Sequence, residues 1–354
     1  MKKILKALLI LVLIVIAAAV LLFGWLTVTE YKPAPVEDAE VLRTGDNASL
    51  AVGDSVTVLS WNVGYGGLGK DSDFFMDGGK DSKSADRETV GRYLEGIHRT
   101  IVDQDPDLVL LQEVDTDSSR TYGIDERGLL AQGMSSQTFA YNYSCPFVPI
   151  PMPPIGKVHS GLFTMTNGVE IERAERISLP CPFTWPTRVA NLKRCLLVSY
   201  LPVAGSDKQL VLVNLHLEAY DDGEGKLAQT KALNDFLQDE YAKGNYVIAG
   251  GDFNQTFPGG LDSYPVVNSA FWAPGTLTED MLPAGWSFAY SLDVPSCRLL
   301  NQPYNPADTV NTQYYVIDGF ILSPNVELET VETLDLGFAD SDHNPVHISV
   351  KLAG

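Results

Sequence analysis

Residues 246–254 read Tyr-Val-Ile-Ala-Gly-Gly-Asp-Phe-Asn, an apolar run that ends in a group of polar side chains. The run from Tyr246 to Ala249 is short and apolar, which is typical of a buried strand. Asp252 and Asn254 follow it directly. A single Asp after a strand is usually a turn or capping residue, so this stretch points to function only if its pattern recurs.

The same pattern, a strand-like run broken by a side chain of the metal-ligand or acid–base type, occurs at five more places. The residues concerned are Asn62, Glu113, Asn214 with His216, Asp318, and Asp342 with His343. Each one alone is more often a hydrogen-bonded polar group of the core. Strand ends at one edge of a sheet lie side by side, so the six blocks together predict one shared cleft.

The remaining chain supplies the strands and helices of a large α/β unit. Strand-like runs cover residues 56–61, 108–111, 161–166, 195–200, 209–217, 315–322 and 346–352, and helical spacing covers residues 88–102 and 225–241. Many short strands with few helices between them predict two packed sheets flanked by helices. With 45% hydrophobic residues the chain can bury one sizeable core, and we expect a single catalytic domain over residues 54–354.

The N-terminal segment is apolar throughout. No charged residue occurs from Ala7 to Thr29, a run of 23 residues. A membrane-spanning helix needs about 20 apolar residues, whereas a cleaved signal peptide has an apolar region of about 7–15. We therefore expect an uncleaved transmembrane anchor over residues 1–29, with a cleaved signal as the alternative. A tether without clear periodicity follows over residues 30–53.

Charge predicts the orientation of this anchor. Lys2, Lys3 and Lys6 precede the apolar run, and acidic residues follow it. The positive-inside rule then predicts a single-pass protein of the cell membrane with a cytoplasmic N-terminus and an extracytoplasmic catalytic domain and tether.

The charge composition disfavours one class of function. The formal net charge is -20, from 45 acidic and 25 basic residues, and no basic run is present. Tight non-specific binding of nucleic acid is therefore disfavoured, although this composition is compatible with a local basic pocket.

Two further patterns do not match known sites. Residues 64–70, Gly-Tyr-Gly-Gly-Leu-Gly-Lys, resemble a phosphate loop, but Asp71 stands where that loop needs Ser or Thr. Cys145, Cys181, Cys195 and Cys297 lack metal-type spacing and are compatible with disulfides or free thiols.

The polar blocks carry a specific resemblance. In chain order they read SWN (60–62), LQEV (111–114), NLHLEA (214–219), GGDFN (250–254), IDGF (317–320) and SDHNPV (341–346). This combination resembles the endonuclease/exonuclease/phosphatase, or DNase I-like, superfamily over about Asp54 to Leu352. The resemblance implies a four-layered α/β sandwich of two mixed β-sheets flanked by helices. It also implies a metal-dependent hydrolase that acts on phosphoester bonds.

The resemblance assigns roles to the polar residues. Glu113 would be the principal ligand of Mg²⁺, with Mn²⁺ as an alternative, and Asn62 and Asp342 would complete the metal group. Hard divalent cations of this kind prefer oxygen ligands.

The catalytic roles follow from the same resemblance. Asp252 would orient or deprotonate the attacking water, and Asn254 would hold a phosphate oxygen. Asp318 would orient His343, which would stabilise the charged phosphate. His216 would face the leaving oxygen or another phosphate oxygen.

Substrate contacts are less specific. His159, Arg188 and Asn214 are the candidates, although a structural hydrogen bond or ion pair is the ordinary role of such residues. The predicted substrate is a phosphorylated small molecule or a lipid head group, and the monoester or diester choice stays open. A nuclease is the first alternative, and a catalytically inactive surface binding module is the second. No obligate protein partner is predicted.

Overall fold

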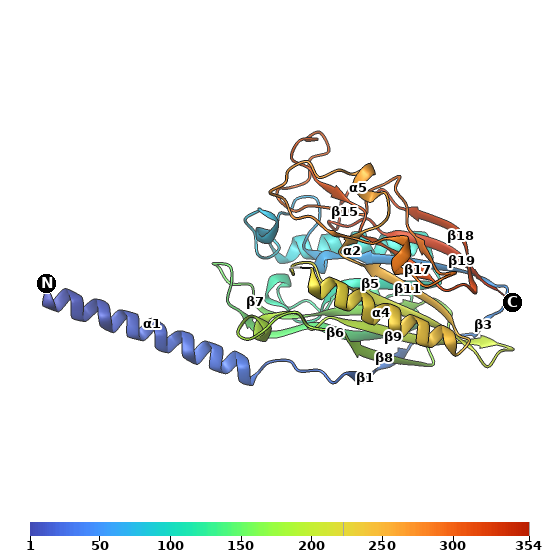
Figure 1. The fold of residues 1–354 in the computed structure, drawn as a ribbon, viewed down its shortest axis with the longest axis horizontal. Helices are drawn as coiled ribbons and strands as arrows, with labels where there is room; N and C mark the ends of the chain where they lie inside the picture. Colours follow the sequence, from blue (N-terminus) through green and yellow to red (C-terminus); the bar gives the residue numbers. More distant parts are fainter. Residues whose placement is uncertain (222, 354) are drawn as a thin grey trace.

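The computed structural model describes residues 1–221 and 223–353. Asp222 and Gly354, the expected last residue of the domain, lie outside the described residues. Two large β-sheets lie face to face, and a helix covers the outer face of each (Figure 1). The prediction of two packed, mixed sheets flanked by helices is confirmed.

The first sheet has the order β1-β8-β9-β10-β11-β17-β14, with β3 beside β9. Its strands are β1 (Val36–Ala39), β3 (Leu50–Ala51), β8 (Arg173–Ser178), β9 (Cys195–Ala204), β10 (Gln209–His216), β11 (Tyr246–Asp252), β14 (Ser287–Ala289) and β17 (Asp318–Leu322). β10 and β11 run parallel, whereas β11 and β17 run antiparallel.

The second sheet has the order β18-β19-β4-β5-β7-β6-β2. Its strands are β2 (Val41–Arg43), β4 (Ser55–Asn62), β5 (Leu108–Asp115), β6 (Ser136–Val148), β7 (Gly156–Thr166), β18 (Val326–Thr333) and β19 (Val346–Leu352). β4 and β5 form the parallel pair at its centre. Two small sheets, β12 (Gln255–Thr256) with β13 (Gly275–Thr276) and β15 (Cys297–Arg298) with β16 (Tyr314–Tyr315), lie in the loops.

The helices are α1 (Lys2–Val28), α2 (Arg87–Gln104), α3 (Arg127–Leu130), α4 (Glu224–Ala242) and α5 (Gly260–Ser263). The 3₁₀ turns are η1 (Gly64–Gly66), η2 (Phe75–Asp77), η3 (Ser119–Thr121), η4 (Thr187–Ala190) and η5 (Glu279–Met281). α2 begins at a capping residue, Asp86, whose Oδ1 accepts a hydrogen bond of 2.7 Å from the Thr89 amide. This bond satisfies one of the free donors of the first turn.

Three apolar clusters hold the layers together. Leu108, Leu210 and Phe320 belong to the cluster between the two sheets. Leu233 of α4 packs on the outer face of the first sheet, and Ile97 of α2 packs on the outer face of the second. The strand ends of both sheets are therefore fixed relative to one another, because every layer buries an apolar face against the next.

The segment predicted as a tether differs from that expectation. β1 pairs with β8 and β3 pairs with β9 in the first sheet, while β2 pairs with β6 in the second. Residues 36–51 therefore extend edges of both sheets. Periodicity does not reveal such strands because they are only two to four residues long.

α1 projects away from the sandwich (Figure 1). It has 27 residues and contains an 18-residue window with a mean hydropathy of 3.2, and among the described residues it is the one helix long and apolar enough to cross a membrane. Length and composition alone do not separate a membrane span from a signal sequence at this position. The last turns of α1 are in contact with the folded domain, where Leu26 is fully buried.

Candidate active site

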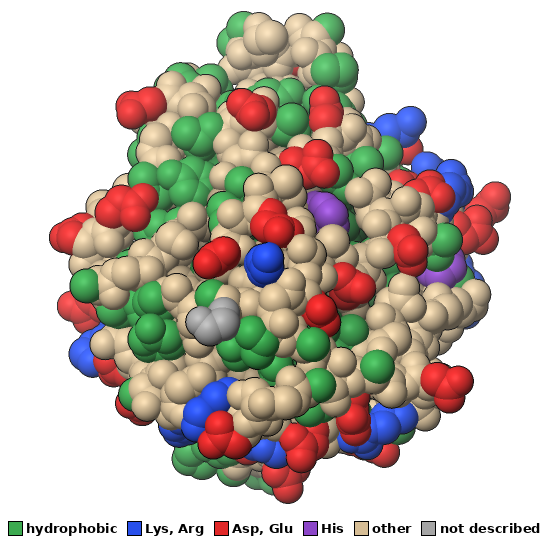
Figure 2. Space-filling view, turned by 90° about the vertical axis from the view of Figure 1, so that its right-hand side faces the viewer, with side chains coloured by type: hydrophobic (Ala, Val, Ile, Leu, Met, Phe, Trp, Pro, Cys, Tyr) green, Lys and Arg blue, Asp and Glu red, His purple; other side chains and the backbone are tan. Residues whose placement is uncertain are grey.

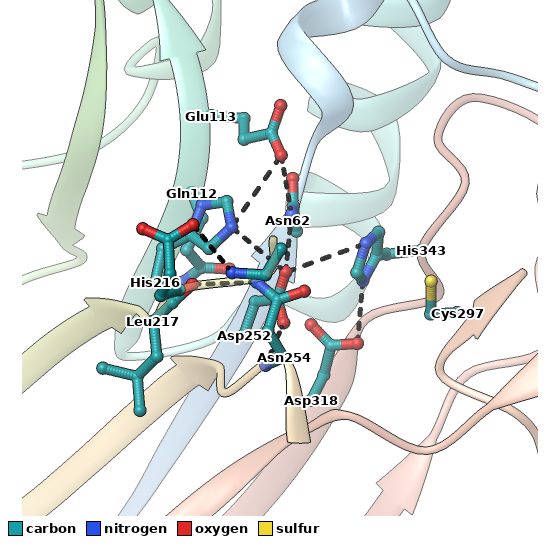
Figure 3. Close-up of polar contacts among 12 residues, drawn as sticks. Asn62, Gln112, Glu113, His216, Leu217, Asp252, Asn254, Cys297, Asp318 and His343 are labelled. Atoms are coloured by element: carbon teal, nitrogen blue, oxygen red, sulfur yellow. Dashed lines mark hydrogen bonds and ion pairs between the residues drawn. The ribbon is translucent and has the colours of Figure 1, made fainter. Parts of the chain in front are cut away.

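Ends of four strands bring the polar blocks together. Asn62 is the last residue of β4, His216 the last of β10 and Asp252 the last of β11, while Asp318 is the first of β17. His216 and Asp318 are the register partners of Asp252 on its two sides. Nδ2 of Asn62 donates a hydrogen bond of 3.0 Å to Oδ2 of Asp252. This bond joins the two sheets at the centre of the site (Figure 3).

The glycine pair before Asp252 permits this close approach. A Cβ at Gly250 would lie 2.4 Å from the Phe320 ring, and a Cβ at Gly251 would lie 1.9 Å from the carbonyl oxygen of Leu215. Heavy atoms do not approach so closely, and only Gly fits where another backbone lies against the strand. The absence of side chains at these positions lets Asp252 lie beside β10, with its Oδ2 at 3.4 Å from Nε2 of His216.

His343 is held in one orientation by a buried chain of hydrogen bonds. Its Nδ1 lies 2.8 Å from Oδ2 of Asp318, which also accepts a 2.7 Å hydrogen bond from Ser296 Oγ. The Trp61 indole donates to the His343 carbonyl at 2.8 Å. Nε2 of His343 then faces Asp252 at 3.9 Å (Figure 3). The predicted orientation of His343 by Asp318 agrees with this geometry.

The site environment moves the pKa values of its two histidines apart. Burial lowers the pKa of His343, but the surrounding groups outweigh burial, first of all the charge of Asp318, so the net pKa is well above the ordinary histidine value. Burial lowers the pKa of His216 well below that value, and the positive charges of Arg194 and His343 add to this. One imidazole is therefore a cation at neutral pH and the other is neutral, the arrangement used for complementary acid and base roles.

Backbone strain gathers at the same place. Positive φ angles, which residues other than Gly rarely adopt, occur at Glu113 (58°), Asn254 (50°) and Tyr65 (44°). Glu113 lies where the pairing of β5 with β7 shifts register between Leu111 and Val114. Such bulges redirect a side chain, and strain of this kind is retained where it positions functional groups.

These residues line a cavity of about 450 Å³. Its polar end contains Asn62, Glu113, His216, Asp252, Asn254, Asp342 and His343. Asn254 Nδ2 donates to the Leu217 carbonyl at 2.9 Å, which fixes the amide at the rim of this polar end. Asp318 is not among the lining residues and lies behind His343.

Burial opposes the ionisation of two carboxyl groups that line the cavity. Burial raises the pKa of Asp252 to about 7, and the negative charge of Asp318 adds to the shift. Burial also raises the pKa of Asp342 to about 7; His343 opposes this and Glu113 adds to it. A buried group of carboxylates with raised pKa values is compensated by a bound cation.

The donor set fits a hard divalent cation. Oε1 of Glu113 accepts one hydrogen bond of 3.2 Å, from Asn62, and within the described part of the chain Oε2 accepts none. The Glu113 side chain is 26% exposed, so it lies where the cavity meets solvent. Glu113 and Asp342 offer carboxylate oxygens, which Mg²⁺ and Mn²⁺ prefer. The predicted ligand Asn62 instead turns its Nδ2 toward Glu113 and Asp252, while its Oδ1 accepts a hydrogen bond of 3.1 Å from the Gly64 amide.

Two other groups within residues 1–221 and 223–353 have potential ligand atoms within 4.8 Å of one another. They are Asp252–Asp318–His343 and Cys297–Asp342–His343. Both contain His343, whose positive charge at neutral pH opposes a second cation there. Glu113 belongs to neither group. The predicted ligands Asn62, Glu113 and Asp342 therefore lie farther apart around the polar end than the members of these two groups do.

The three candidates for substrate contact lie elsewhere. Asn214 is fully buried between the sheets, where Gln112 donates to its Oδ1 at 2.9 Å. His159 lies beside the Tyr141 ring, and Nε of Arg188 lies 2.9 Å from Oε1 of Glu30, two residues beyond the end of α1. None of the three is among the residues that line the cavity.

Sequence reasoning did not assign a site role to the arginines that line the cavity, among them Arg120 and Arg194. Arg120 binds Asp115 through two hydrogen bonds and lies 3.6 Å from the centre of the Tyr65 ring. Arg194 is buried, and its Nε has no hydrogen-bond partner in the described chain. No motif marks either residue. All four cysteines, which lie in the described segments, are free thiols.

Known proteins share this architecture. A protein from Beutenbergia cavernae DSM 12333, named as an endonuclease/exonuclease/phosphatase, superposes with a TM-score of 0.56 at 17% identity, over 85% of this chain and 72% of that one. A functionally unknown protein from Enterococcus faecalis V583 gives 0.54 at 16% identity, over 83% and 98%. The human Nocturnin catalytic domain with bound sulfate gives 0.52 at 17% identity, over 89% and 98%.

Identities this low establish the fold alone. No curated protein matches the sequence at a significant level. A model of the Endonuclease/Exonuclease/phosphatase family, however, matches residues 59–343, which include Asn62 of the first polar block and His343 of the last. The chain therefore belongs to the endonuclease/exonuclease/phosphatase family, whose members hydrolyse phosphoester bonds.

Proposed function

We propose that this protein is a membrane-anchored, extracytoplasmic phosphoesterase that depends on a divalent metal ion. The observation that carries the proposal is the meeting of Asn62, His216, Asp252 and His343 at one end of a cavity, with Glu113 and Asp342 beside them. The apolar helix α1 and its flanking charges support the anchor and its orientation.

The side chains divide the chemistry between them. A divalent cation held by Glu113 and Asp342, with Asn62 beside it, would offset charge on the phosphate oxygens. Asp252 accepts a hydrogen bond from Asn62 and lies between the two histidines, so it is placed to align a water molecule and accept its proton. His343, as a cation, stabilises negative charge on the phosphate, and His216 donates to an oxygen of the ester.

Hydrolysis tests this proposal directly. The protein should hydrolyse p-nitrophenyl phosphate or bis-p-nitrophenyl phosphate in the presence of Mg²⁺, and EDTA should abolish the activity. Activity that survives complete removal of metal would contradict the metal-dependent mechanism. If no activity appears on these esters or on panels of lipids and nucleic acids, an inactive binding module becomes the better description.

A nuclease is the alternative with the same chemistry. Long nucleic acid needs several cationic contacts to its phosphates. On the face shown in Figure 2, Asp and Glu side chains are spread widely and Lys and Arg form only small groups. That face is the side of the sandwich away from α1, and the whole chain has a net charge of -20 and no basic run. This composition does not favour long nucleic acid, and a small or membrane-borne phosphoester suits the acidic protein better.

The shifted pKa values in the site predict how the free energy of unfolding depends on pH. In the metal-free protein, Asp252 and Asp342 have a pKa of about 7 when folded, against an ordinary value of 3.8. The unfolded chain therefore loses these protons first, and stability should fall as pH rises from about 4 to about 8. The raised pKa of His343 acts in the same direction, because its contribution is present below the unfolded pKa and is lost above the folded one. The lowered pKa of His216 acts in the opposite direction below the unfolded value of 6.5, but it is one group against three.

Metal should reverse this trend. Binding requires deprotonated carboxylates, so added Mg²⁺ should raise the melting temperature more at about pH 8 than at about pH 5.5. Calorimetry in EDTA and in excess Mg²⁺ at both pH values measures the difference. A shift of equal size at both would argue against a site made from these carboxylates.

A further inference from the structure

One wall of the cavity is shared with the end of the N-terminal helix. Leu26, Leu22 and Phe23 of α1 pack in one apolar cluster with Val148 and Ile155, which flank the loop between β6 and β7. Val148 and Ile155 also line the cavity, as do Phe75 and Tyr143 of the same cluster. The apolar end of the cavity is therefore continuous with the surface on which the helix rests.

Polar contacts, which include one buried carboxylate, fix the helix in this position. The side chain of Glu30, two residues beyond α1, is 2% exposed and lies 2.9 Å from Arg188 and 3.4 Å from Lys193. The Trp185 indole donates to Thr27 Oγ1 at 3.1 Å. A charge buried among such partners is costly to withdraw, so the helix end and the cavity keep one relative orientation.

The loop beside the helix has the properties of a segment that enters a lipid surface. Residues 149–154 read Pro-Ile-Pro-Met-Pro-Pro, and the side chains of Ile150 and Met152 are 64% and 86% exposed. Proline has no backbone N–H, so four of these six residues bring no amide donor that would need a partner in lipid. In Figure 1 this loop extends toward the side from which α1 projects.

The length of α1 places the bilayer at the level of this loop. The hydrocarbon core is about 30 Å thick and takes about 20 helical residues. The uncharged run ends at Thr29, so the contacts of Leu22, Phe23 and Leu26 with the domain fall at its outer boundary. Trp185, which is 58% exposed beside them, is of the residue type that gathers at this boundary.

We propose that the substrate is a lipid phosphoester of the membrane that holds α1. Its phosphate would bind at the polar end, near Asn62, Asp252 and His343, and its apolar chains would lie along Phe75, Ile150 and Ile155 toward the bilayer. This inference rests on the proposed phosphoesterase activity and adds the class of substrate. The acidic surface does not oppose it, because a lipid reached within the bilayer needs no long-range attraction to the protein.

Two esters that differ only in their apolar tail test the proposal. The full-length protein is reconstituted in phosphatidylcholine vesicles and given hexadecyl or ethyl p-nitrophenyl phosphate, or hexadecyl and ethyl phosphate if it proves to be a monoesterase. We expect kcat/KM for the hexadecyl ester to exceed that for the ethyl ester by about tenfold or more, the order expected for contact with one large apolar side chain.

Two substitutions in the loop locate the effect. Ile150→Asp and Met152→Asp should each lower the ratio of hexadecyl to ethyl turnover by about tenfold. Leu328→Asp is the matched control, because Leu328 is 40% exposed on β18, at the side of the sandwich away from α1 (Figure 1). The control should leave the ratio unchanged.

The outcomes separate this inference from the proposed function. Hydrolysis of the ethyl ester with no preference for the hexadecyl ester, or a ratio that Ile150→Asp and Met152→Asp leave unchanged, overturns the lipid assignment alone. Hydrolysis of neither ester type overturns the phosphoesterase proposal and the lipid assignment with it. A preference lost equally in Leu328→Asp would place the lipid contact outside this loop and also overturn the assignment.

Discussion

Asp252→Asn should lower kcat for phosphoester hydrolysis by about 10³-fold, within the range that a positioned acid–base group contributes. The asparagine keeps nearly the same shape but cannot accept a proton from water. Asp252 also contacts Asn62 at 3.0 Å and lies within 4 Å of both His216 and His343. Rate measurements at saturating substrate and Mg²⁺, with circular dichroism to verify folding, determine the loss.

The exposed Asp262 on α5 provides the matched control, and Asp262→Asn should retain full activity. The buried charge of Asp252 is costly, since burial raises its pKa to about 7. The variant should therefore be at least as stable as the wild type near pH 8 without metal. A loss of activity below tenfold would remove Asp252 from the proton-transfer step.

The polar blocks could be predicted because each is local in sequence and follows a recognisable strand. Asn62 and Asp252 end β4 and β11, and parallel pairing within each sheet then brings such ends to one edge. The same reasoning misplaced Asn214, which precedes His216 by two residues on β10. Side chains two apart on a strand share a face but differ in depth, and Asn214 lies inside the sandwich rather than in the cavity.

Contacts between distant segments could not be predicted from these patterns. Arg188 binds Glu30, which lies 158 residues away in the sequence, and β2 pairs with β6, which lies nearly 100 residues away. No periodic pattern in the sequence marks these segments as partners. The proline-rich loop at 149–154 has the composition of an ordinary surface loop. Only its position beside Leu26 and Trp185 connects it with a membrane.

Glu113→Gln should remove most of the metal-dependent activity, by about 10²–10³-fold at limiting Mg²⁺, since loss of a charged ligand costs several kcal/mol of stabilisation in the transition state. In the wild-type protein Oε1 of Glu113 accepts a hydrogen bond of 3.2 Å from Asn62, and the glutamine oxygen can accept the same bond. The fold and the bulge at β5 should therefore persist. Activity titrated against Mg²⁺ should show a weaker apparent affinity, and calorimetry should show a smaller stabilisation by Mg²⁺.

Glu95→Gln, on the exposed face of α2, is the control that should change neither quantity. The two measurements also discriminate between metal positions. If Glu113→Gln keeps full activity and the full Mg²⁺-dependent rise in melting temperature, the ion cannot be held at the open side of the cavity. It would then have to lie in one of the groups around His343, and Cys297→Ser would test the group that contains Asp342, because Cys297 contributes a ligand atom only there.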